Sequence, residues 1–303
     1  MSKGHPTLSL EAAPLSAPLM RETLAERGFT FEETSHAFWR ARGTGCTVTF
    51  YQKGKVVLQG PDALAVAALL GLEGELPKGP LERFEEALAL HPTPPPEAWL
   101  GSDETGKGDY FGPLVVVAFR LERSHVPLAA ELGAADSKRL SDAKVSAIAP
   151  ELARLGEFAT VQIGPRAYNR LYAKMGNLNH LLAWAHSRAI QDLLAKAPVD
   201  YGVVDRFAEP RLITSRMTRA ECTIRLDQRP RAEDDPAVAI ASILARREFL
   251  HSLAKLSREA GFKLPKGAGP PVIAAGRRII DEHGREALER FAKLHFTTTR
   301  SLG

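Results

Sequence analysis

Cysteine is scarce in this sequence of 303 residues, which contains only Cys46 and Cys222. The two lie far apart and show no CxxC pair or Cys/His spacing, which excludes a disulfide framework and the common zinc sites. No apolar run approaches the roughly 20 residues of a membrane-spanning helix. The first residues, MSKGHPTLSLEAAP, also lack the charged-then-apolar pattern of a signal peptide. We therefore expect a soluble, cytoplasmic protein that does not bind membranes.

The sequence also lacks a large excess of either positive or negative charge. Lys and Arg together number 40 against 36 Asp and Glu, for a formal net charge of +4. This small excess favours polyanionic partners but does not identify one. The apolar fraction of 44% and the charged fraction of 25% are those of a globular protein, so disorder is not expected. The length allows two domains with buried cores.

Proline marks the expected boundary between these domains. The segment HPTPPPE at 91–97 contains three consecutive prolines, which favour extended backbone over a packed element. We predict an N-terminal domain at 1–90, a linker at 91–98 and a second domain at 99–303. The first has expected helices at 19–27 and 61–72 and strands at 47–51 and 55–59, which indicates a small α+β unit.

The second domain alternates strands and helices. Strands are expected at 100–103, 114–119, 158–163, 201–205 and 222–226, and long helices at 165–174, 178–196 and 236–255. This order predicts an α/β domain with a mixed sheet covered by helices.

Two adjacent acids, Asp103 and Glu104, precede a glycine-rich turn and the apolar run 114–119. Neighbouring residues of a strand point to opposite faces, so one site normally receives only one of them. Carboxylates beside a buried strand are costly to desolvate unless a cation compensates them. The pair therefore suggests a bound metal ion.

Two further acidic positions occupy similar contexts. Asp205 ends the apolar strand YGVV, and Glu233, Asp234 and Asp235 open the helix PAVAIASILA. Carboxylates that converge at strand ends suit hard divalent cations, which can assist phosphodiester cleavage. Alternatively, Asp205 is a simple strand-end residue, and the cluster caps its helix and compensates the helix dipole.

The turn after the acid pair contains Gly106, Lys107 and Gly108. It lacks the GxxxxGK[ST] spacing of a nucleotide-binding P-loop and the Rossmann GxGxxG pattern. Glycines let bare backbone N–H and C=O groups approach a ligand, and a ribose 2′-hydroxyl is both a donor and an acceptor. The turn could therefore recognise ribose, or it could be a tight hairpin without a ligand.

These motifs together resemble a known family. GSDETGKGDYFGPLVVVA closely resembles the first catalytic motif of bacterial ribonuclease HIII, within the wider ribonuclease HII group. The resemblance continues in order through ADSKRLSD, YNRLYAKMGNLNHLLAWAHSRAI, VVDRFAEP, AVAIASILARREF, LPKGAG and KLHF. TFYQKGKVVLQG resembles the strand pair of the family's N-terminal domain. The implied fold is an α/β ribonuclease-H-like mixed sheet with helices, plus a small N-terminal α+β domain that is TATA-binding-protein-like.

The resemblance implies an endonuclease that hydrolyses the RNA strand of RNA–DNA hybrids with Mg²⁺ or Mn²⁺. The family uses four carboxylates as catalytic residues and metal ligands, and Asp103, Glu104 and Asp205 match three of them. Aligning RAE at 231–233 with the family's basic–alanine–acid triplet gives Glu233 as the fourth, where aspartate is more common. Counting outward from the following helix gives Asp235 instead. We choose Glu233.

The family's substrate contacts map onto several further residues. Gly106, Lys107 and Gly108 would read 2′-hydroxyls, and Lys138 in the DSK segment would contact a phosphate. In the N-terminal domain, Tyr51, Lys53 and Lys55 join Arg40 and Arg42 in putting cations and an aromatic ring on one small sheet, a usable nucleic-acid surface. That sheet could also be an ordinary half-exposed one. His186 and His295 are interpreted as packing or surface histidines.

Two rival functions remain at this stage. One is incision at a single ribonucleotide within duplex DNA, which the glycine turn and the N-terminal domain disfavour. The other is a catalytically silent hybrid-binding protein, which the retained acids disfavour. We expect a monomer.

Overall fold

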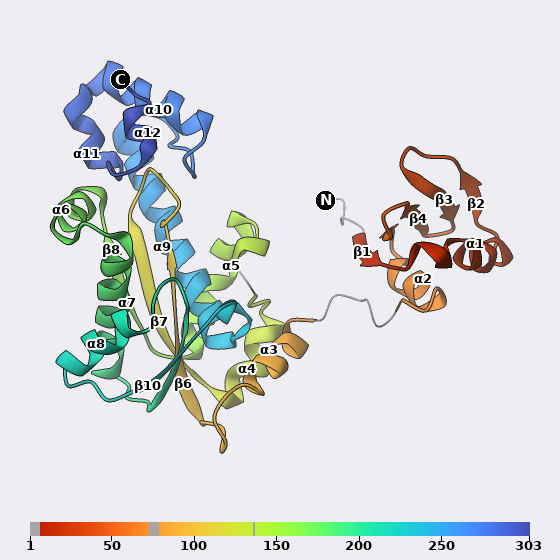
Figure 1. Cartoon of the computed structure of the whole chain (residues 1–303), viewed down its shortest axis with the longest axis horizontal. Helices are drawn as coiled ribbons and strands as arrows, with labels where there is room; N and C mark the ends of the chain where they lie inside the picture. The colour runs from red at the N-terminus through yellow and green to blue at the C-terminus, as the bar shows by residue number, and fades with distance from the viewer. Residues whose placement is uncertain (1–6, 73–78, 136) are drawn as a thin grey trace. The chain divides into compact units, whose positions relative to one another are not determined.

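The computed structural model describes residues 7–72, 79–135 and 137–303. The chain divides into two compact units, Met1–Gly79 and Pro80–Gly303. Each unit has its own sheet (Figure 1); the first has one apolar core, and the second has one on each face of its sheet.

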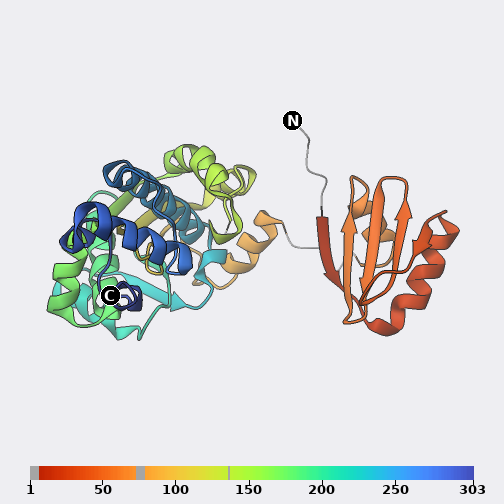
Figure 2. The ribbon, with the colours of Figure 1, turned by 90° about the horizontal axis from the view of Figure 1, so that it is seen from above.

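The first unit is a five-stranded antiparallel sheet with helices on one face (Figure 2). In spatial order its elements are β1 Thr7–Glu11, β5 Lys55–Gln59, β4 Cys46–Tyr51, β3 Ala37–Gly43 and β2 Thr30–Glu32, covered by α1 Ala17–Glu26 and α2 Ala63–Leu69. Val48, Phe50 and Leu58 point to the helices and are fully buried. The residues between them face the open side, which is the period-two pattern of a sheet covered on one face.

The second unit contains a mixed five-stranded sheet. In spatial order its strands are β10 Arg225–Arg229, β9 Tyr201–Asp205, β6 Ala98–Thr105, β7 Leu114–Glu122 and β8 Phe158–Ile163. β10, β9 and β6 are parallel, whereas β6, β7 and β8 form an antiparallel meander. The predicted strands 158–163 and 201–205 are confirmed, and β10 overlaps the predicted 222–226 but begins three residues later, at Arg225.

Helices cover both faces of this sheet (Figure 1). α9 with α5 packs on one face, and α7 with α8 packs on the other. The helices of the unit are α3 Pro80–Leu88, α4 Val126–Glu131, α5 Asp142–Leu152, α6 Pro165–Met175, α7 Leu178–Leu194, α8 Arg211–Arg219, α9 Pro236–Ala260, α10 Pro270–His283, α11 Leu288–Phe291 and α12 Thr297–Arg300. Within the described residues, no helix combines the length and apolar character needed to cross a membrane.

The boundary between the units lies earlier than predicted, between residues 79 and 80 rather than after 90. α3 belongs to the second unit because Phe84 is buried in its core and the helix packs against α4. The expected linker at 91–98 also lies within this unit: His91 is buried, and Arg123 donates to the carbonyls of Pro96 and Glu97. Proline predicts extended backbone, but extended backbone can lie against a domain as well as between domains.

Residues near the C-terminus form hydrogen bonds with the turn that follows β6. The Lys293 N–H donates to the Tyr110 carbonyl at 2.8 Å, and the Gly112 N–H donates to the Phe291 carbonyl at 3.0 Å. The fully buried Lys293 side chain donates to the carbonyls of Gly112 and Pro113, at 2.7 and 3.4 Å. Burial lowers the pKa of Lys293 to about 7. A neutral amine still has the two protons that these bonds need.

A first prediction concerns the revised boundary. Phe84→Ala in the full chain should lower the free energy of unfolding by about 3–5 kcal/mol, because it opens a cavity in the main core. Phe158→Ala is the matched control, since Phe158 is 38% exposed and should cost much less. Urea unfolding of both variants makes the comparison. Equal losses would show that α3 does not belong to the core of the second unit.

A second prediction concerns Lys293. The folded protein releases its proton near pH 7, whereas the unfolded chain keeps it up to the ordinary lysine value of 10.5. Between these values the unfolded state binds more protons, so the wild type should gain stability with rising pH relative to Lys293→Met. Urea unfolding at about pH 6 and about pH 9 measures this difference. The exposed Lys255→Met is the control, and a stability difference for Lys293→Met that does not change with pH would contradict the prediction.

Candidate active site

Two acids lie side by side on neighbouring strands. β6 and β9 run parallel, with Ser102 aligned to Val204. The next residue on each strand is an acid, so Asp103 and Asp205 meet at the carboxyl ends of the two strands. Ligand sites of open α/β sheets commonly lie at this edge. Parallel pairing thus brings together two acids that are distant in the sequence.

Asp103 and Glu104 point to opposite faces of the sheet. The Asp103 carboxylate receives a hydrogen bond from Ser242 of α9. Glu104 Oε2 lies 3.2 Å from Nε2 of His186, which belongs to α7 on the other face. The alternation expected for adjacent strand residues is confirmed. Both acids lie at the end of β6, whose last residue is Thr105.

The two carboxylates differ in how their charge is compensated. Burial, followed by the charge of Glu104, raises the pKa of Asp103 to about 7. Burial also acts to raise the pKa of Glu104, but the hydrogen bond and charge of His186, together with Lys107, lower it to about 2. Among the described residues, neither Asp103 nor Asp205 forms an ion pair with a cationic side chain. Uncompensated negative charge is therefore concentrated at these two acids.

His186 is a functional residue that the sequence interpretation underrated. The Ser102 hydroxyl donates to the Val117 carbonyl at 3.0 Å and also lies 2.8 Å from Nδ1 of His186. Nε2 faces the Glu104 carboxylate, which accepts, so this ring nitrogen donates. The buried ring also stacks on Phe207 at a centroid distance of 5.0 Å. His186 does pack, as expected, but it also orients an acid of the site.

A pocket of about 530 Å³ opens at this edge of the sheet. Seven of the predicted site residues line it: Asp103, Glu104, Gly106, Lys107, Gly108, Lys138 and Asp205. The pocket is also lined by residues that were not predicted, including Asp109, Ser137, Ser242, Arg246 and Phe249. The hydroxyls of Ser137 and Ser242 lie 2.8 Å apart, and Arg246 donates to the Ser137 carbonyl. These contacts fix the segment beside Lys138 against α9.

The lysines of the pocket have different surroundings. Nζ of Lys107 lies 3.4 Å from Glu104 Oε1, and its side chain is 43% exposed. Lys138 is exposed at the pocket rim. Lys266 pairs with Asp142 at 2.6 Å, which gives it a structural contact within the protein. Lys107, Lys138 and Lys266 thus all present at least partly exposed side chains at the pocket.

Gly106 and Gly108, the two glycines predicted to contact ribose, are glycine for different reasons. Gly106 has a φ of +94°, and a Cβ there would collide with the Pro113 carbonyl, so the turn itself requires it. Gly108 has no left-handed backbone, and a Cβ there would meet no described atom within 4 Å. Neither backbone nor packing explains Gly108, whose missing side chain leaves the backbone open to the pocket.

The structure separates the candidates for the fourth acid. Asp235 is fully buried and caps α9, where it accepts from the Ala237 N–H at 2.9 Å. It cannot also face the pocket. Glu233 and Asp234 are half-buried in the 3₁₀ turn Ala232–Asp234. The Ala232 N–H reaches Asp205 Oδ1 at 3.4 Å, which places this turn beside the site, although Glu233 itself does not line the pocket.

The predicted residues of the first unit lie around one hairpin. Tyr51 ends β4, Lys55 begins β5, and Lys53 lies in the turn between them. Lys53 and Lys55 are exposed, and Tyr51 is half-exposed on the open side of the sheet. Arg40 and Arg42, by contrast, both pair with Glu32, at 3.4 and 3.0 Å. The two lysines are therefore the cations of this group without a carboxylate contact among the described residues.

The donor set of the pocket fits a hard divalent cation. Its acids offer only oxygen ligands, which suit Mg²⁺ or Mn²⁺. The half-buried, desolvated Asp103 carboxylate would also gain from compensating positive charge. Throughout the described part of the chain, no three His, Cys, Asp or Glu side chains are close enough together to hold a metal ion as they stand. Mutual repulsion keeps uncompensated carboxylates apart, so the acids would have to draw closer around a cation.

Comparisons with known proteins agree with this site. The ribonuclease HII family model matches residues 100–299, and a domain of unknown function, DUF3378, matches residues 19–78. Ribonuclease HIII of Protochlamydia amoebophila is 35% identical over 300 residues, covering 98% of this chain and 97% of the relative. Ribonuclease HIII of Chlamydia pneumoniae is 38% identical and covers 92% of each chain.

Solved structures of ribonucleases H are also similar to this chain. The crystal structure of Bst-RNase HIII in complex with Mn²⁺ has a TM-score of 0.67 and 30% identity, and the match covers 98% of each chain. Ribonuclease H2 from Pyrococcus horikoshii shares the fold, with a TM-score of 0.60 at 18% identity over 68% of this chain. These similarities confirm the predicted fold class. The chain belongs to the ribonuclease HII family and is a metal-dependent ribonuclease H endonuclease that hydrolyses the RNA strand of RNA–DNA hybrids.

Proposed function

We propose that Asp103, Glu104, Asp205 and Glu233 are the catalytic carboxylates and hold Mg²⁺ or Mn²⁺. The observation that carries this proposal is the parallel pairing of β6 and β9, which aligns Asp103 with Asp205 at the mouth of the pocket. When bound, such ions activate a water molecule and stabilise the leaving oxygen of the phosphodiester. The turn containing Glu233 touches Asp205 through the Ala232 N–H, which supports Glu233 as the fourth member.

Neighbouring residues orient these acids and affect their charge. His186 donates to Glu104 and keeps its carboxylate ionised and oriented. Ser242 donates to Asp103, and its contact with Ser137 ties the acid to the segment that carries Lys138. Lys107 and Lys138 are exposed at the pocket, where they contact substrate phosphates.

The glycine turn selects RNA. Gly108 leaves its backbone groups accessible beside the acids, where a ribose 2′-hydroxyl would lie. Because the turn spans Gly106 to Gly108, it can contact more than one ribose of a continuous RNA strand. The preferred substrate is therefore a continuous hybrid rather than a single ribonucleotide embedded in DNA.

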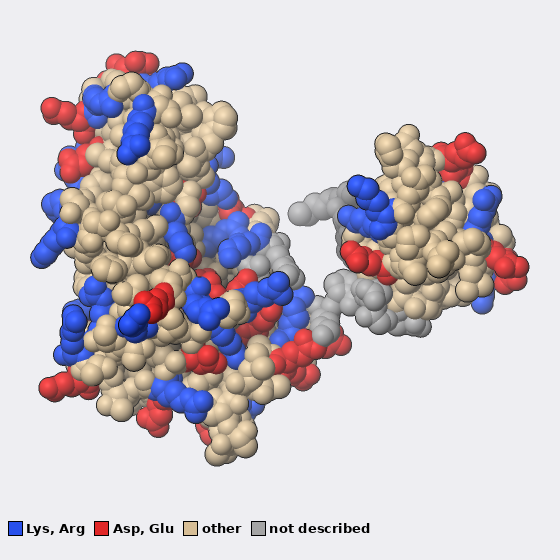
Figure 3. Space-filling view, in the orientation of Figure 1, with Lys and Arg blue, Asp and Glu red and all other residues tan. Residues whose placement is uncertain are grey.

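The first unit binds the hybrid through Tyr51, Lys53 and Lys55. The hairpin presents two exposed cations and an aromatic ring, which suit phosphates and a ribose or base face. Charge elsewhere is less informative: Figure 3 shows basic side chains spread over the visible face of the second unit with acidic ones among them. The free cysteines, Cys46 and Cys222, suit a reducing compartment, and we place the enzyme in the cytoplasm as a monomer.

Asp103→Asn tests the metal site. Cleavage of a continuous hybrid in Mn²⁺ should fall by at least about 10²-fold, because a shared anionic ligand is lost. Hybrid binding, measured by fluorescence anisotropy, should change little, since the fold and the lysines remain. Asp192→Asn, which removes an acid from an exposed ion pair with Arg188, is the control for net charge and should cleave normally.

Two results would overturn these assignments. Normal cleavage by Asp103→Asn would show that the pocket is not the metal site. Efficient cutting by the wild type of a duplex with one ribonucleotide, but not of a continuous hybrid, would show that the glycine turn reads a single ribose.

The hairpin of the first unit has its own test. Lys53→Gln/Lys55→Gln should weaken hybrid affinity and reduce the slope of log K against log salt by about 1–2, while kcat is unchanged. Arg21→Gln/Arg27→Gln removes the same charge from α1 and the residue that ends it, on the helical side of the unit. An equal loss in both variants would reveal a general charge effect rather than a binding hairpin.

A further inference from the structure

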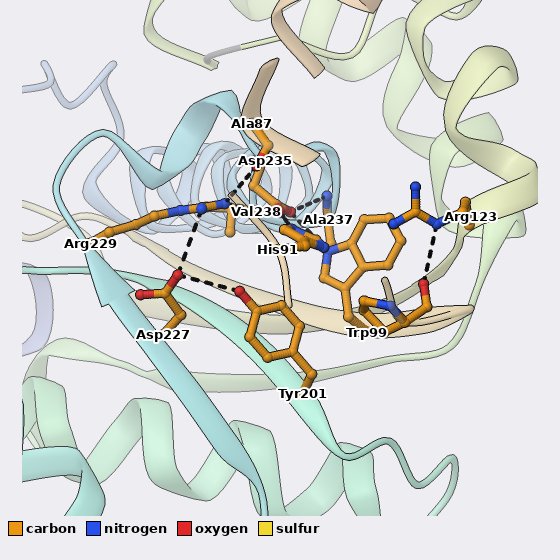
Figure 4. A network of polar contacts seen from close by, with 11 residues as sticks. Ala87, His91, Trp99, Arg123, Tyr201, Asp227, Arg229, Asp235, Ala237 and Val238 are labelled. Atoms are coloured by element: carbon orange, nitrogen blue, oxygen red, sulfur yellow. Dashed lines mark hydrogen bonds and ion pairs between the residues drawn. The ribbon is translucent and has the colours of Figure 1, made fainter. Parts of the chain in front are cut away.

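A buried polar network surrounds Asp235 (Figure 4). The Asp235 carboxylate is fully buried, and both of its oxygens are satisfied. Oδ1 accepts from the Ala237 N–H at 2.9 Å and from the Trp99 indole N–H at 3.0 Å. Oδ2 lies 2.7 Å from His91 Nε2 and 3.4 Å from Arg229 Nη2. The network therefore joins β6, β10, α9 and the segment after α3.

His91 is the least expected member of this network. Its Nε2 faces a carboxylate, so that nitrogen must donate, whereas Nδ1 has no partner among the described residues. The ring packs edge-on against Trp99 and Tyr201, at centroid distances of 4.9 and 5.0 Å. Burying an imidazole with one nitrogen unpaired costs free energy. If the ring only packed against apolar neighbours, phenylalanine would be more favourable here. The contact with Asp235 is therefore what a histidine adds.

Asp235 fixes the turn that precedes it. The Asp235 N–H donates to the Ala232 carbonyl at 2.9 Å and closes the turn Ala232–Asp234. The Ala232 N–H at the start of that turn donates to Asp205 Oδ1. Glu233 lies between these two hydrogen bonds. Whatever holds Asp235 therefore also sets the direction of Glu233 and supports Asp205.

The same network is tied to the strand that carries Asp103. A Cβ at Gly101 would collide with the backbone of Ala237 and Val238, so the start of α9 rests directly on β6. Trp99 on that strand donates to Asp235. The relative position of β6 and the turn is thus set within two residues of Asp103.

We propose that His91 and Asp235 are positioning residues for the metal-binding carboxylates. They touch neither substrate nor metal; they hold the turn Ala232–Asp234 in the position from which Glu233 and Asp205 bind the ion. This inference rests on the proposed function, which assigns Glu233 as a ligand. It gives the segment after α3, which the proline pattern marks as a linker, a role in the active site.

The test measures Mn²⁺ binding by calorimetry without substrate, and then kcat and KM on a continuous hybrid. His91→Phe fills the space without a donor and should weaken Mn²⁺ binding about 10-fold, as loss of a supporting hydrogen bond does in metal sites. Asp235→Asn, which keeps an acceptor for the helix N-terminus, should do the same. Both should lower kcat at fixed Mn²⁺ while KM for the hybrid stays within about twofold. His91→Gln restores a donor and should recover most of the binding.

The controls separate positioning from folding. His125→Phe removes another ring that contacts a carbonyl, that of Leu155 at 2.8 Å, and should bind Mn²⁺ like the wild type. Circular dichroism at the titration temperature confirms that each variant is folded. Folded His91→Phe and Asp235→Asn with wild-type Mn²⁺ affinity would overturn the inference, as would unchanged affinity in Glu233→Gln. Unchanged affinity in Asp103→Asn would instead refute the proposed metal site.

Discussion

The desolvation of the half-buried Asp103 on a central strand is the constraint on which the site depends. A carboxylate in that position is desolvated and lies beside a second acid, Asp205, on the parallel neighbouring strand. Among the described residues, Ser242 supplies a hydroxyl, and Asp103 forms no ion pair with a cationic side chain. A bound cation would favour the charged form, so the position that costs the fold free energy is also the one that attracts metal.

The opposite face of the same strand is arranged differently. Glu104 receives a hydrogen bond from His186, whose other nitrogen is fixed by Ser102, and it also lies near Lys107. This acid is ionised before any metal arrives. The strand therefore offers one acid that its protein partners already hold and one that depends on a ligand. Such a difference arises because adjacent residues of a strand face different layers, here α7 and α9.

Much of the fold could be predicted from the sequence, because local patterns determine it. The apolar run before Asp205 becomes β9 between the predicted residues, and the helix after Asp235 begins where proline and the acid indicate. The domain boundary could not be predicted in this way. Only the packing of Phe84 shows that α3 belongs to the second unit. The role of His186 was also inaccessible, since no local pattern links α7 to Glu104.

In the acidic cluster before α9, the need to cap the helix N-terminus determines which acid is available to bind a metal ion. α9 is 25 residues long, and its first turn is buried against β6, where water cannot satisfy its N–H groups. A buried N-terminus needs an acceptor, and the residue in the capping position is Asp235. Its carboxylate is committed to the backbone, to Trp99 and to His91. Glu233, two positions earlier and outside the helix, has no such duty and remains available to the active site.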